Sequence, residues 1–437
     1  MARNVESIPH ADFALPIIGN ALNLFLSQED FFLNCFDKYG PIFRFNVMGM
    51  SFVCLVGPEA NQFILKDFPE YFSSYKGWSF IEPLFDKSIL LQDGPEHQRT
   101  RKMMMPSFHS SSINEYCRLI HEITQTSLDK LTNQERTISL NDFFHDLTSE
   151  ISWKLLLGSR ANNRIQYFQN IFNQFTKGVQ TVLRVKSTIT RFGKAISAKK
   201  QLRELLQEEI DYRRTFFTDD ILGLLLRSAD QDGNTLSDDE VITNCLQLIF
   251  GGFDTLPLLL CWSLYELNAN PAYLQMIRDQ LDSFGEIRLD SFRQADKLDF
   301  FLKEMERLYP PAYVVPRGVL TAFDYLGYRI PERYYVVYSP LLTHRIPDLF
   351  EDPNRFDPLR FSIPREEHKI HPFGLIGFGG GAHKCLGIEL ASLEMRVILA
   401  TLIKKFDWKV YPDLSFLESR NRASINNRNL AASFEVR

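Results

Sequence analysis

A long apolar segment, residues 238–269, constrains the fold more than any other part of the sequence. Ser237 and Glu240 form a capping box at its start, and Asn270-Pro271 closes its far end. A helix of about 32 residues is about 48 Å long, because each residue adds about 1.5 Å. Apolar side chains cover nearly all of its faces, so we expect it to run through the core of the protein.

The middle of this helix is predicted to break. Two glycines precede Asp254 and Thr255, and Pro257 follows them. Proline has no N–H to donate to the carbonyl of Phe253, and its ring crowds that carbonyl. A freed carbonyl, a carboxylate and a hydroxyl would then face one small gap inside the protein. A simpler interpretation is a packing kink in which Thr255 bonds its own backbone.

Length and composition are those of a globular protein. The chain has 437 residues, of which 45% are hydrophobic and 24% charged, and its formal net charge is -5. This balance argues against a nucleic-acid-binding protein, which usually shows a strongly basic face. No linker or repeat divides the sequence, so we expect one domain over residues 1–437. Short β-like runs at about 40–60 and 310–345, with helical patterns over about 96–305, predict a mainly α protein with small β-sheets (α+β).

The cysteines and the N-terminal residues indicate in which cellular compartment the protein is expected. Six cysteines are scattered along the chain without a C-x-x-C pair, which excludes a disulfide scaffold and predicts a reduced protein. The N-terminal residues lack the apolar core of a signal peptide, and no other segment reads as a membrane anchor. We therefore expect a cytoplasmic protein in which at most one cysteine has a chemical role.

The cysteine with the most distinctive surroundings is Cys385, in the glycine-rich loop 377–387. A stripe of apolar residues at helical spacing follows, so Cys385 lies close to a predicted helix N-terminus. The helix dipole and the free N–H groups there favour a thiolate. Glycines permit a tight loop and a close approach of the backbone to a flat ligand. A thiolate in such a loop is a good soft ligand for iron.

Two other interpretations of this loop stay open. Gly377, Gly379 and Ala382 fit the G-x-G-x-x-[GA] dinucleotide fingerprint, although no convincing strand precedes them and only about 60 residues follow. Cys385 could also be a catalytic nucleophile, but the sequence identifies no oriented His or Asn partner. Neither a G-x-S-x-G elbow nor a Walker A loop occurs in the chain.

Several segments together resemble the cytochrome P450 family of haem-thiolate monooxygenases, soluble bacterial type. The resemblance covers nearly the whole chain, and its most specific part is the haem signature at Phe378, Gly381, His383, Cys385 and Gly387. It implies a single P450-type domain with haem b (iron protoporphyrin IX) buried between the long central helix and the cysteine loop. Cys385 would be the axial iron ligand, and Phe378, His383 and Gly387 would border the cofactor.

Two further motifs of the family are present. Asp254 and Thr255 match the acid–alcohol pair of the oxygen-activation helix, and would deliver protons to bound oxygen. Glu304 and Arg307 match the Glu-x-x-Arg helix, and would form a buried network with Arg360. Without the resemblance, Glu304 and Arg307 are an i,i+3 helix pair, which is usually a minor surface ion pair.

The resemblance also implies a set of propionate ligands. His97 and Arg101, four residues apart on one helical face, would hold a propionate, and Arg317 and His383 stand at further positions of this kind. Cationic donors suit a dianionic cofactor whose carboxylates are partly buried.

The sequence departs from the family pattern at a few positions. Leu256 and Pro257 replace the second threonine and the residue after it, and Gly251 replaces the usual alanine. Gly377 stands where a proline is common, and Arg333 replaces a usual glycine. The changes in the helix bear on how tightly oxygen is held and on how well electron use is coupled to product. The acid–alcohol pair itself remains, which favours an enzyme that uses a reductant.

Aromatic residues are abundant, with 37 Phe and 16 Tyr. We expect a substrate pocket bordered by Trp78, Phe80, Phe253, Tyr313 and Val314. An apolar pocket predicts a lipophilic small molecule such as a fatty acid, a terpenoid or a retinoid.

The chain shows no flavin or iron–sulfur domain, so electrons from NAD(P)H would arrive through separate proteins, a ferredoxin and a ferredoxin reductase. One interpretation makes Arg99, Lys102, Lys384 and Arg396 a basic docking face for an acidic ferredoxin. A scattered set of solvated charges explains the same residues.

The sequence thus predicts a haem-thiolate monooxygenase that inserts one oxygen atom from O₂ into a lipophilic substrate. One alternative is a haem-thiolate isomerase, dehydratase or peroxygenase that needs no external electrons. Another is a haem protein that senses or carries a ligand without catalysis. A flavin or nicotinamide enzyme built on the glycine loop is a further alternative.

Overall fold

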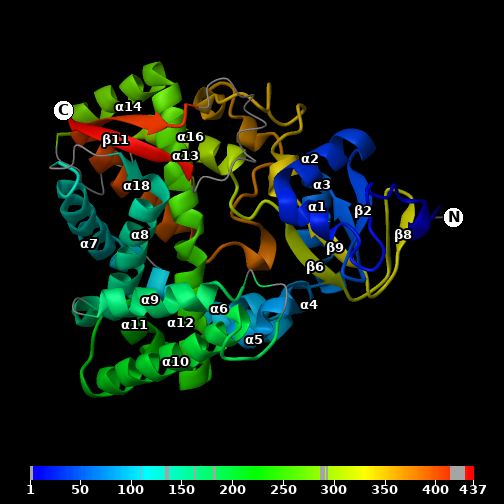
Figure 1. Cartoon of the computed structure of the whole chain (residues 1–437), viewed down its shortest axis with the longest axis horizontal. Helices are drawn as coiled ribbons and strands as arrows, with labels where there is room; N and C mark the ends of the chain where they lie inside the picture. Colours follow the sequence, from blue (N-terminus) through cyan, green and yellow to red (C-terminus); the bar gives the residue numbers. More distant parts are fainter. Residues whose placement is uncertain are drawn as a thin grey trace.

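The computed structural model describes residues 3–108, 110–132, 137–161, 164–179, 181, 184–285, 291, 294–413 and 429–437. The long helices fill one side of the molecule, and the largest sheet lies on the other with the first three α-helices, while a small sheet that contains the last two described strands lies among the helices (Figure 1). The N-terminus lies at the β-rich edge and the C-terminus among the helices (Figure 1). The described residues are mainly helical with small β-sheets, so the predicted fold class is confirmed.

The helices differ widely in length, and the longest described one, α10, lies on the helical side (Figure 1). Their bounds are α1 Ala21–Leu26, α2 Gln28–Tyr39, α3 Pro58–Gln62, α4 Ser74–Trp78, α5 Glu82–Phe85, α6 Gly94–Met104, α7 Ser110–Asp129, α8 Leu140–Leu157, α9 Ile165–Thr176, α10 Arg191–Thr215, α11 Ile221–Arg227, α12 Asp238–Phe253, α13 Thr255–Ala269, α14 Pro271–Ser283, α16 Asp296–Leu308, α17 Pro340–Thr343 and α18 Ile388–Lys405.

The strands are short and form three sheets among the described residues. Their bounds are β1 Arg3–Asn4, β2 Ile42–Val47, β3 Met50–Leu55, β4 Phe72–Ser73, β5 Ile138–Ser139, β6 Val315–Val319, β7 Phe323–Tyr325, β8 Tyr328–Ile330, β9 Tyr335–Tyr338, β10 Phe406–Tyr411 and β11 Ala431–Val436.

The largest sheet joins segments that are far apart in the sequence. Its strand order is β2-β3-β9-β6-β4. β2 and β3 form an antiparallel hairpin, and β9 runs parallel to β3. The two β-rich regions at about 40–60 and 310–345 therefore contribute to one sheet, and β6 of this sheet carries Arg317 to the wall of the cavity described below.

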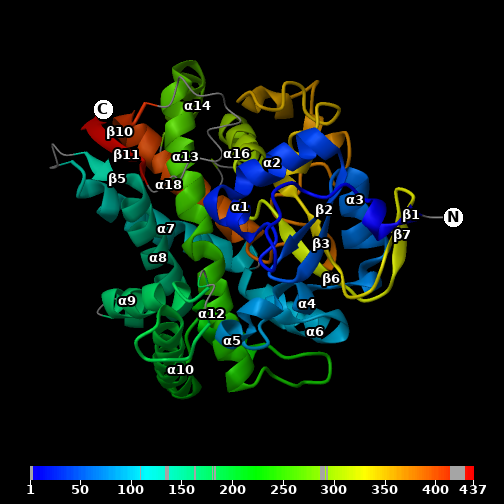
Figure 2. The same ribbon diagram turned by 45° about the vertical axis from the view of Figure 1, so that its right-hand side comes forward.

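The long helix is present, and it breaks where the sequence predicts. Ser237 caps α12 with a complete capping box, and Asp254 is a turn residue between α12 and α13. The Thr255 hydroxyl donates to the carbonyl of Gly251 at 2.6 Å, so the backbone bond of the simpler interpretation is also present. Figure 2 shows the two segments as one column that crosses the molecule.

Among the described residues, one helical stretch is long and apolar enough to cross a membrane, Asp238–Ala269. Of its most apolar window, 56% is buried inside the fold. A core helix meets the same criteria of length and composition, and α12 and α13 supply many side chains to the largest hydrophobic cluster.

The cysteine loop leads directly into α18, as its apolar stripe predicts. Within residues 371–387, all of which the structure describes, there are turns and one 3₁₀ turn, Gly381–His383, but no strand. A dinucleotide fingerprint needs a strand immediately before its glycines. The local fold therefore does not support the dinucleotide interpretation.

Candidate active site

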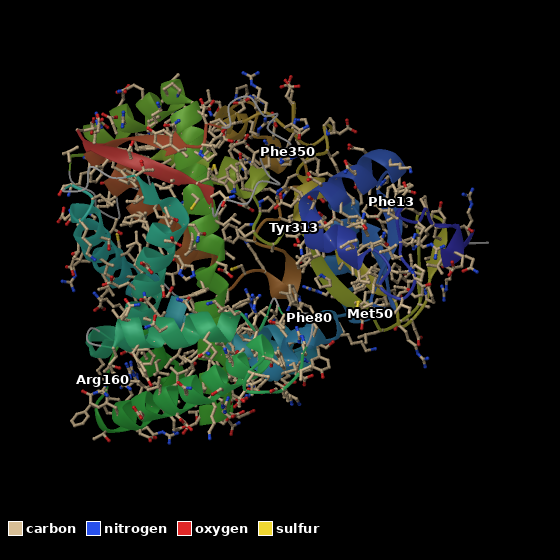
Figure 3. All side chains as sticks on the ribbon, viewed as in Figure 1. Phe13, Met50, Phe80, Arg160, Tyr313 and Phe350 are labelled. Carbon is tan, nitrogen blue, oxygen red and sulfur yellow. The ribbon has the colours of Figure 1, made fainter. Side chains whose placement is uncertain are left out.

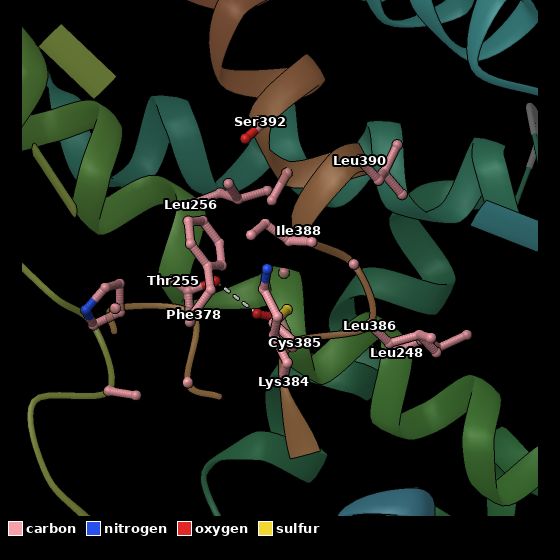
Figure 4. A pocket seen from close by; sticks show the side chains of 18 of the residues that line it. Leu248, Thr255, Leu256, Phe378, Lys384, Cys385, Leu386, Ile388, Leu390 and Ser392 are labelled. Carbon is pink, nitrogen blue, oxygen red and sulfur yellow. Dashed lines mark hydrogen bonds between the residues drawn. The ribbon is translucent and has the colours of Figure 1, made fainter. Parts of the chain in front are cut away.

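A cavity of about 600 Å³ is bordered by the break in the long helix and by the cysteine loop. This volume is within the range of cavities that hold small molecules and cofactors. Figure 4 shows Thr255 and Leu256 from α13 and Phe378, Cys385 and Leu386 from the loop around the same space. Much of the remaining wall is apolar, and its members include Ile89, Leu90, Leu155, Leu156, Leu248 and Leu259.

Cys385 lies on the wall of this cavity. It is exposed, whereas the other five cysteines, all in the described part of the chain, are buried. Its N–H donates to the carbonyl of Phe378 at 2.9 Å, which closes the loop. Gly381 permits this path, because its φ is +62° and a Cβ there would lie 1.9 Å from the carbonyl oxygen of Leu65. The loop thus presents one sulfur atom to the cavity.

The protonation of Cys385 depends on opposing effects. Desolvation by the surrounding protein raises the pKa of the thiol above its ordinary value. The N–H of Gly387 and the positive charges of Arg101 and Lys384 lower that pKa. A metal ion would decide the balance, because a coordinated thiol loses its proton. Cys385 is therefore suited to hold a soft metal such as haem iron.

A cluster of basic side chains lines the cavity beside the loop: His97, Arg101, Arg317 and His383. The rings of His97 and His383 stack with their centroids 3.9 Å apart. Burial and the charge of Arg101 lower the pKa of His97 to about 4. Burial, Arg317 and His97 lower the pKa of His383 to about 2. Both imidazoles are therefore neutral at ordinary pH, and the positive charge of the cluster comes from Arg101 and Arg317, which an anion would neutralise.

The cluster and its surroundings fit the carboxylates of a porphyrin. Among the described residues, Arg101 forms no ion pair or hydrogen bond with a carboxylate. The buried indole N–H of Trp78, also on the cavity wall, has no acceptor among the described residues. Gly251 and Gly387 leave open space where a side chain would project, which suits the close approach of a flat ring.

The structure separates the two residues of the predicted acid–alcohol pair. Thr255 lines the cavity, whereas Asp254 is exposed and is not among the lining residues, although the structure describes it fully. The break in the helix therefore places a hydroxyl at the cavity and a carboxylate beside it on the outside.

Glu304, Arg307 and Arg360 come together in a network with no exposed side-chain surface. Arg307 donates two hydrogen bonds to the Glu304 carboxylate, at 2.7 and 2.8 Å, and Arg360 lies 3.2 Å from the same group. The N–H of Asp357 also donates to Glu304, at 2.8 Å. This is a buried core pair, and not the surface pair that helical spacing alone suggests.

The sequence reasoning did not single out His344, which joins this network to the cysteine loop. Its Nδ1 donates to the carbonyl of Arg307 at 3.0 Å, and its Nε2 accepts the N–H of Ile376 at 3.0 Å. Burial and the charge of Arg307 lower the pKa of His344 to about 3, so the ring stays neutral at ordinary pH. The only signal in the sequence is a histidine within a largely apolar stretch, 340–346.

The comparisons with known proteins agree with this geometry. The family model named cytochrome P450 matches residues 9–434. The chain belongs to the cytochrome P450 family. It is 29% identical over 414 residues to "Putative cytochrome P450 120" of Synechocystis sp., which covers 94% of this chain and 92% of that protein. It is 28% identical over 403 residues to "Putative cytochrome P450 136" of Mycobacterium tuberculosis, which covers 90% of this chain and 82% of that protein.

A solved P450 structure has the same fold. Retinoic-acid-bound cyanobacterial CYP120A1 matches with a TM-score of 0.90 and 26% sequence identity, over 100% of both chains. Membership in the family makes the chain a monooxygenase, an oxidoreductase that uses haem b, O₂ and electrons from NAD(P)H. The flavin and nicotinamide alternatives therefore fall away.

Of the five residues predicted to border a substrate pocket, one lines the cavity and four lie outside its lining. Only Trp78 lines the cavity, while Phe80, Phe253, Tyr313 and Val314, all described, do not. Phe253 packs against His145 and Phe172 on the far side of α12. Phe80 is 46% exposed. Figure 3 shows Tyr313 beside the N-terminal helices, where Tyr313 and Val314 pack in the cluster around Phe32.

Two residues of the predicted basic docking face are paired within the P450 itself. Arg99 bonds Asp230 and Glu240, at 3.1 and 3.0 Å, and Arg396 bonds Asp299 at 2.8 Å. Lys102 and Lys384 remain exposed. The structure thus narrows the candidate docking charges to these two lysines.

Proposed function

We propose that this P450 oxygenates a lipophilic small molecule, with Cys385 as the axial ligand of its haem and with electrons from a separate ferredoxin. The observation that carries the proposal is the position of Cys385, the exposed cysteine, on the wall of a largely apolar cavity that also contains Thr255. When bound, haem b activates O₂ so that one oxygen atom enters the substrate and the other leaves as water.

The residues around Cys385 would hold the cofactor in place. Arg101, Arg317 and the two histidines supply donors to the propionates, and the Trp78 indole N–H adds a neutral donor. The Gly387 N–H and the charge of Lys384 stabilise the thiolate. Phe378 and Gly387 border the ring from the loop side. These assignments rest on the lining of the cavity and on the charge of the cluster.

The break in the long helix would serve proton delivery. Thr255 holds a hydroxyl at the cavity wall, and that hydroxyl can exchange its 2.6 Å bond to the Gly251 carbonyl for a bond to a ligand. Asp254, the adjacent exposed carboxylate, can take protons from solvent. Proline at 257 keeps the backbone open at this point, because it cannot donate to Phe253.

The substrate is proposed to be an elongated apolar molecule of the fatty acid, terpenoid or retinoid class. Leucine and isoleucine side chains from several elements form much of the wall. The related CYP120A1 structure holds retinoic acid, which is such a molecule. A series of saturated fatty acids of increasing length tests this. Each added methylene is expected to tighten binding about fourfold until the cavity is filled, since burial of one CH₂ contributes about 0.8 kcal/mol.

The change in the haem absorption band on titration measures that binding. Retinoic acid and long-chain fatty acids are expected to shift the band, and short polar compounds to leave it unchanged. Affinity independent of chain length, or a shift by polar compounds alone, contradicts a lipophilic substrate.

Replacement of Thr255 by alanine tests the proton path. The variant keeps Cys385 and the cavity, so we expect haem content and CO binding to be unchanged. Without the hydroxyl, the ratio of product to NAD(P)H consumed is expected to fall about tenfold or more, and hydrogen peroxide to take up the difference. Thr243→Ala, in α12 but outside the cavity lining, is the matched control. Full coupling in Thr255→Ala would rule out the proton path.

An acidic ferredoxin is the proposed electron donor in a cytoplasmic setting. Lys384 directly precedes Cys385 in the cysteine loop, and Lys102 lies on α6 next to Arg101. Both are exposed, so a negatively charged partner can approach the loop at this point. A single domain over residues 1–437 is part of the same proposal.

A further inference from the structure

The start of the cysteine loop is held by a carboxylate that the roles above do not explain. Glu306, in α16, lines the cavity, and the backbone N–H groups of Gly377 and Phe378 lie close enough to its carboxylate to lower its pKa. Phe378 in turn accepts the N–H of Cys385 at 2.9 Å. Glu306 therefore lies against the short backbone segment that bonds the N–H of Cys385.

Gly377 and Glu306 fit each other sterically. A Cβ at Gly377 would lie 2.3 Å from Cγ of Glu306 and 3.0 Å from its Oε1, so a larger residue fits only if the glutamate moves. Gly377 is not among the residues with positive φ, so its conformation alone does not require glycine. The position needs space and an N–H group. Proline, common here in the family, supplies neither.

We propose that Glu306 is a positioning residue for the haem ligand. Together with Gly377 it fixes the start of the cysteine loop, and its carboxylate places a negative charge beside Cys385. The inference rests on Cys385 as the ligand, as proposed above. It explains why this chain has glycine where its family commonly has proline, because the glycine N–H lies close to a carboxylate that proline would displace.

The charge of Glu306 responds to pH near neutrality. Burial raises its pKa to about 7, although the N–H groups of Gly377 and Phe378 and the charges of nearby lysines oppose the rise. The charged groups on the elements that border this part of the cavity are Asp299 and Lys303 of α16, Lys384 of the loop, and Glu394 and Arg396 of α18. Asp299 and Arg396 form an ion pair with each other.

Glu394 offers a matched control. It also lines the cavity, it is 3% exposed, and burial raises its pKa to about 8. Unlike Glu306, its Oε1 has no hydrogen-bond partner among the described residues. A change at Glu394 removes a carboxyl group from the wall of the same cavity without touching the N–H groups of the cysteine loop.

The steric fit is tested by Gly377→Ala in two backgrounds. The readout is the half-life, on mild warming, of the red-shifted Soret band of the reduced CO complex, which reports the thiolate ligand. In the otherwise native chain we expect Gly377→Ala to shorten this half-life about tenfold. In the Glu306→Ala background, where Cγ and Oε1 are gone, we expect less than about a twofold further change. Equal effects in both backgrounds would overturn the inference.

The charge is tested by Glu306→Gln, which keeps the shape of the side chain. As pH falls through about 7 and Glu306 takes up a proton, the reduction potential of the bound haem is expected to rise, because a nearby negative charge favours the oxidised iron. Glu306→Gln is expected to raise the potential above pH 7 and to remove this pH dependence. Glu394→Gln should retain it. A pH dependence that survives Glu306→Gln, or that Glu394→Gln abolishes, overturns the inference.

The wild-type spectrum separates this inference from the proposed function. A thiolate-type CO spectrum in the wild type, together with unchanged Glu306 and Gly377 variants, overturns only the role of Glu306. Absence of that spectrum in the wild type overturns both.

Discussion

Cys385→Ala is expected to abolish the red-shifted Soret band of the reduced, CO-bound protein. The red shift arises from a thiolate bound to the iron, and Cys385 is the cysteine whose sulfur faces the cavity. The other five are buried in the hydrophobic clusters, and burial raises the pKa of those such as Cys54 and Cys245, so none of them can replace it. Haem retained by the variant should show only an unshifted band.

Cys261→Ala is the control for this experiment. Cys261 is fully buried in α13, on the same helix as Thr255 but outside the cavity lining. Its truncation removes a sulfur atom and leaves a small cavity, so some stability is lost while the thiolate-type band remains. A red-shifted band that persists in Cys385→Ala, or that disappears in Cys261→Ala, contradicts the assignment of the ligand.

Glu304→Gln is expected to cost about 3–5 kcal/mol in the free energy of unfolding. The Glu304 carboxylate lies between the guanidinium groups of Arg307 and Arg360, and none of the three side chains is exposed. Glutamine has the same shape, but it brings no negative charge, and its NH₂ group faces donors instead of acceptors. The guanidinium charges of Arg307 and Arg360 would then be buried without the Glu304 carboxylate between them. Removal of one partner from a buried ion pair is strongly destabilising, because it leaves a buried charge uncompensated.

Denaturant unfolding and the ratio of haem to protein measure this effect together. The ratio of haem to protein is expected to decrease as the variant loses stability, because the network is attached to the cysteine loop through His344. Glu204→Gln is the surface control, since Glu204 is 62% exposed and lies 3.8 Å from Lys200 on the same helix. Such a pair contributes about 0.5 kcal/mol or less. Similar losses in the two variants would show that burial of the network is not what stabilises it.

The sequence predicts local features of the fold well and tertiary neighbours poorly. The capping box at Ser237 and the break beside Pro257 depend on residues within one turn, so they can be read from the chain. The direction in which the Phe253 side chain points cannot be predicted in this way. A helix that is apolar on every face does not reveal which face lines a cavity and which packs against α9. Arg99 was expected at a docking face, but its partner Asp230 is 131 residues away.

The same limit applies to the candidate site. The glycine loop and Cys385 carry a dense local pattern, and the resemblance to a family adds roles for distant residues. No sequence motif surrounds Glu306 or His344. Their roles come from contacts with backbone N–H groups that are distant in the sequence, those of Gly377 and Ile376. A glutamate on a predicted helix is ordinarily a solvated residue.

The attachment of Ile376 to His344 also couples cofactor binding to the packing of the core. The loop that presents Cys385 begins near a backbone N–H whose acceptor is an imidazole bonded in turn to the carbonyl of Arg307. The position of the sulfur is therefore tied to the packing of α16 against the chain around residue 344. A substitution that loosens this packing is expected to weaken cofactor binding even though it changes no residue that lines the cavity.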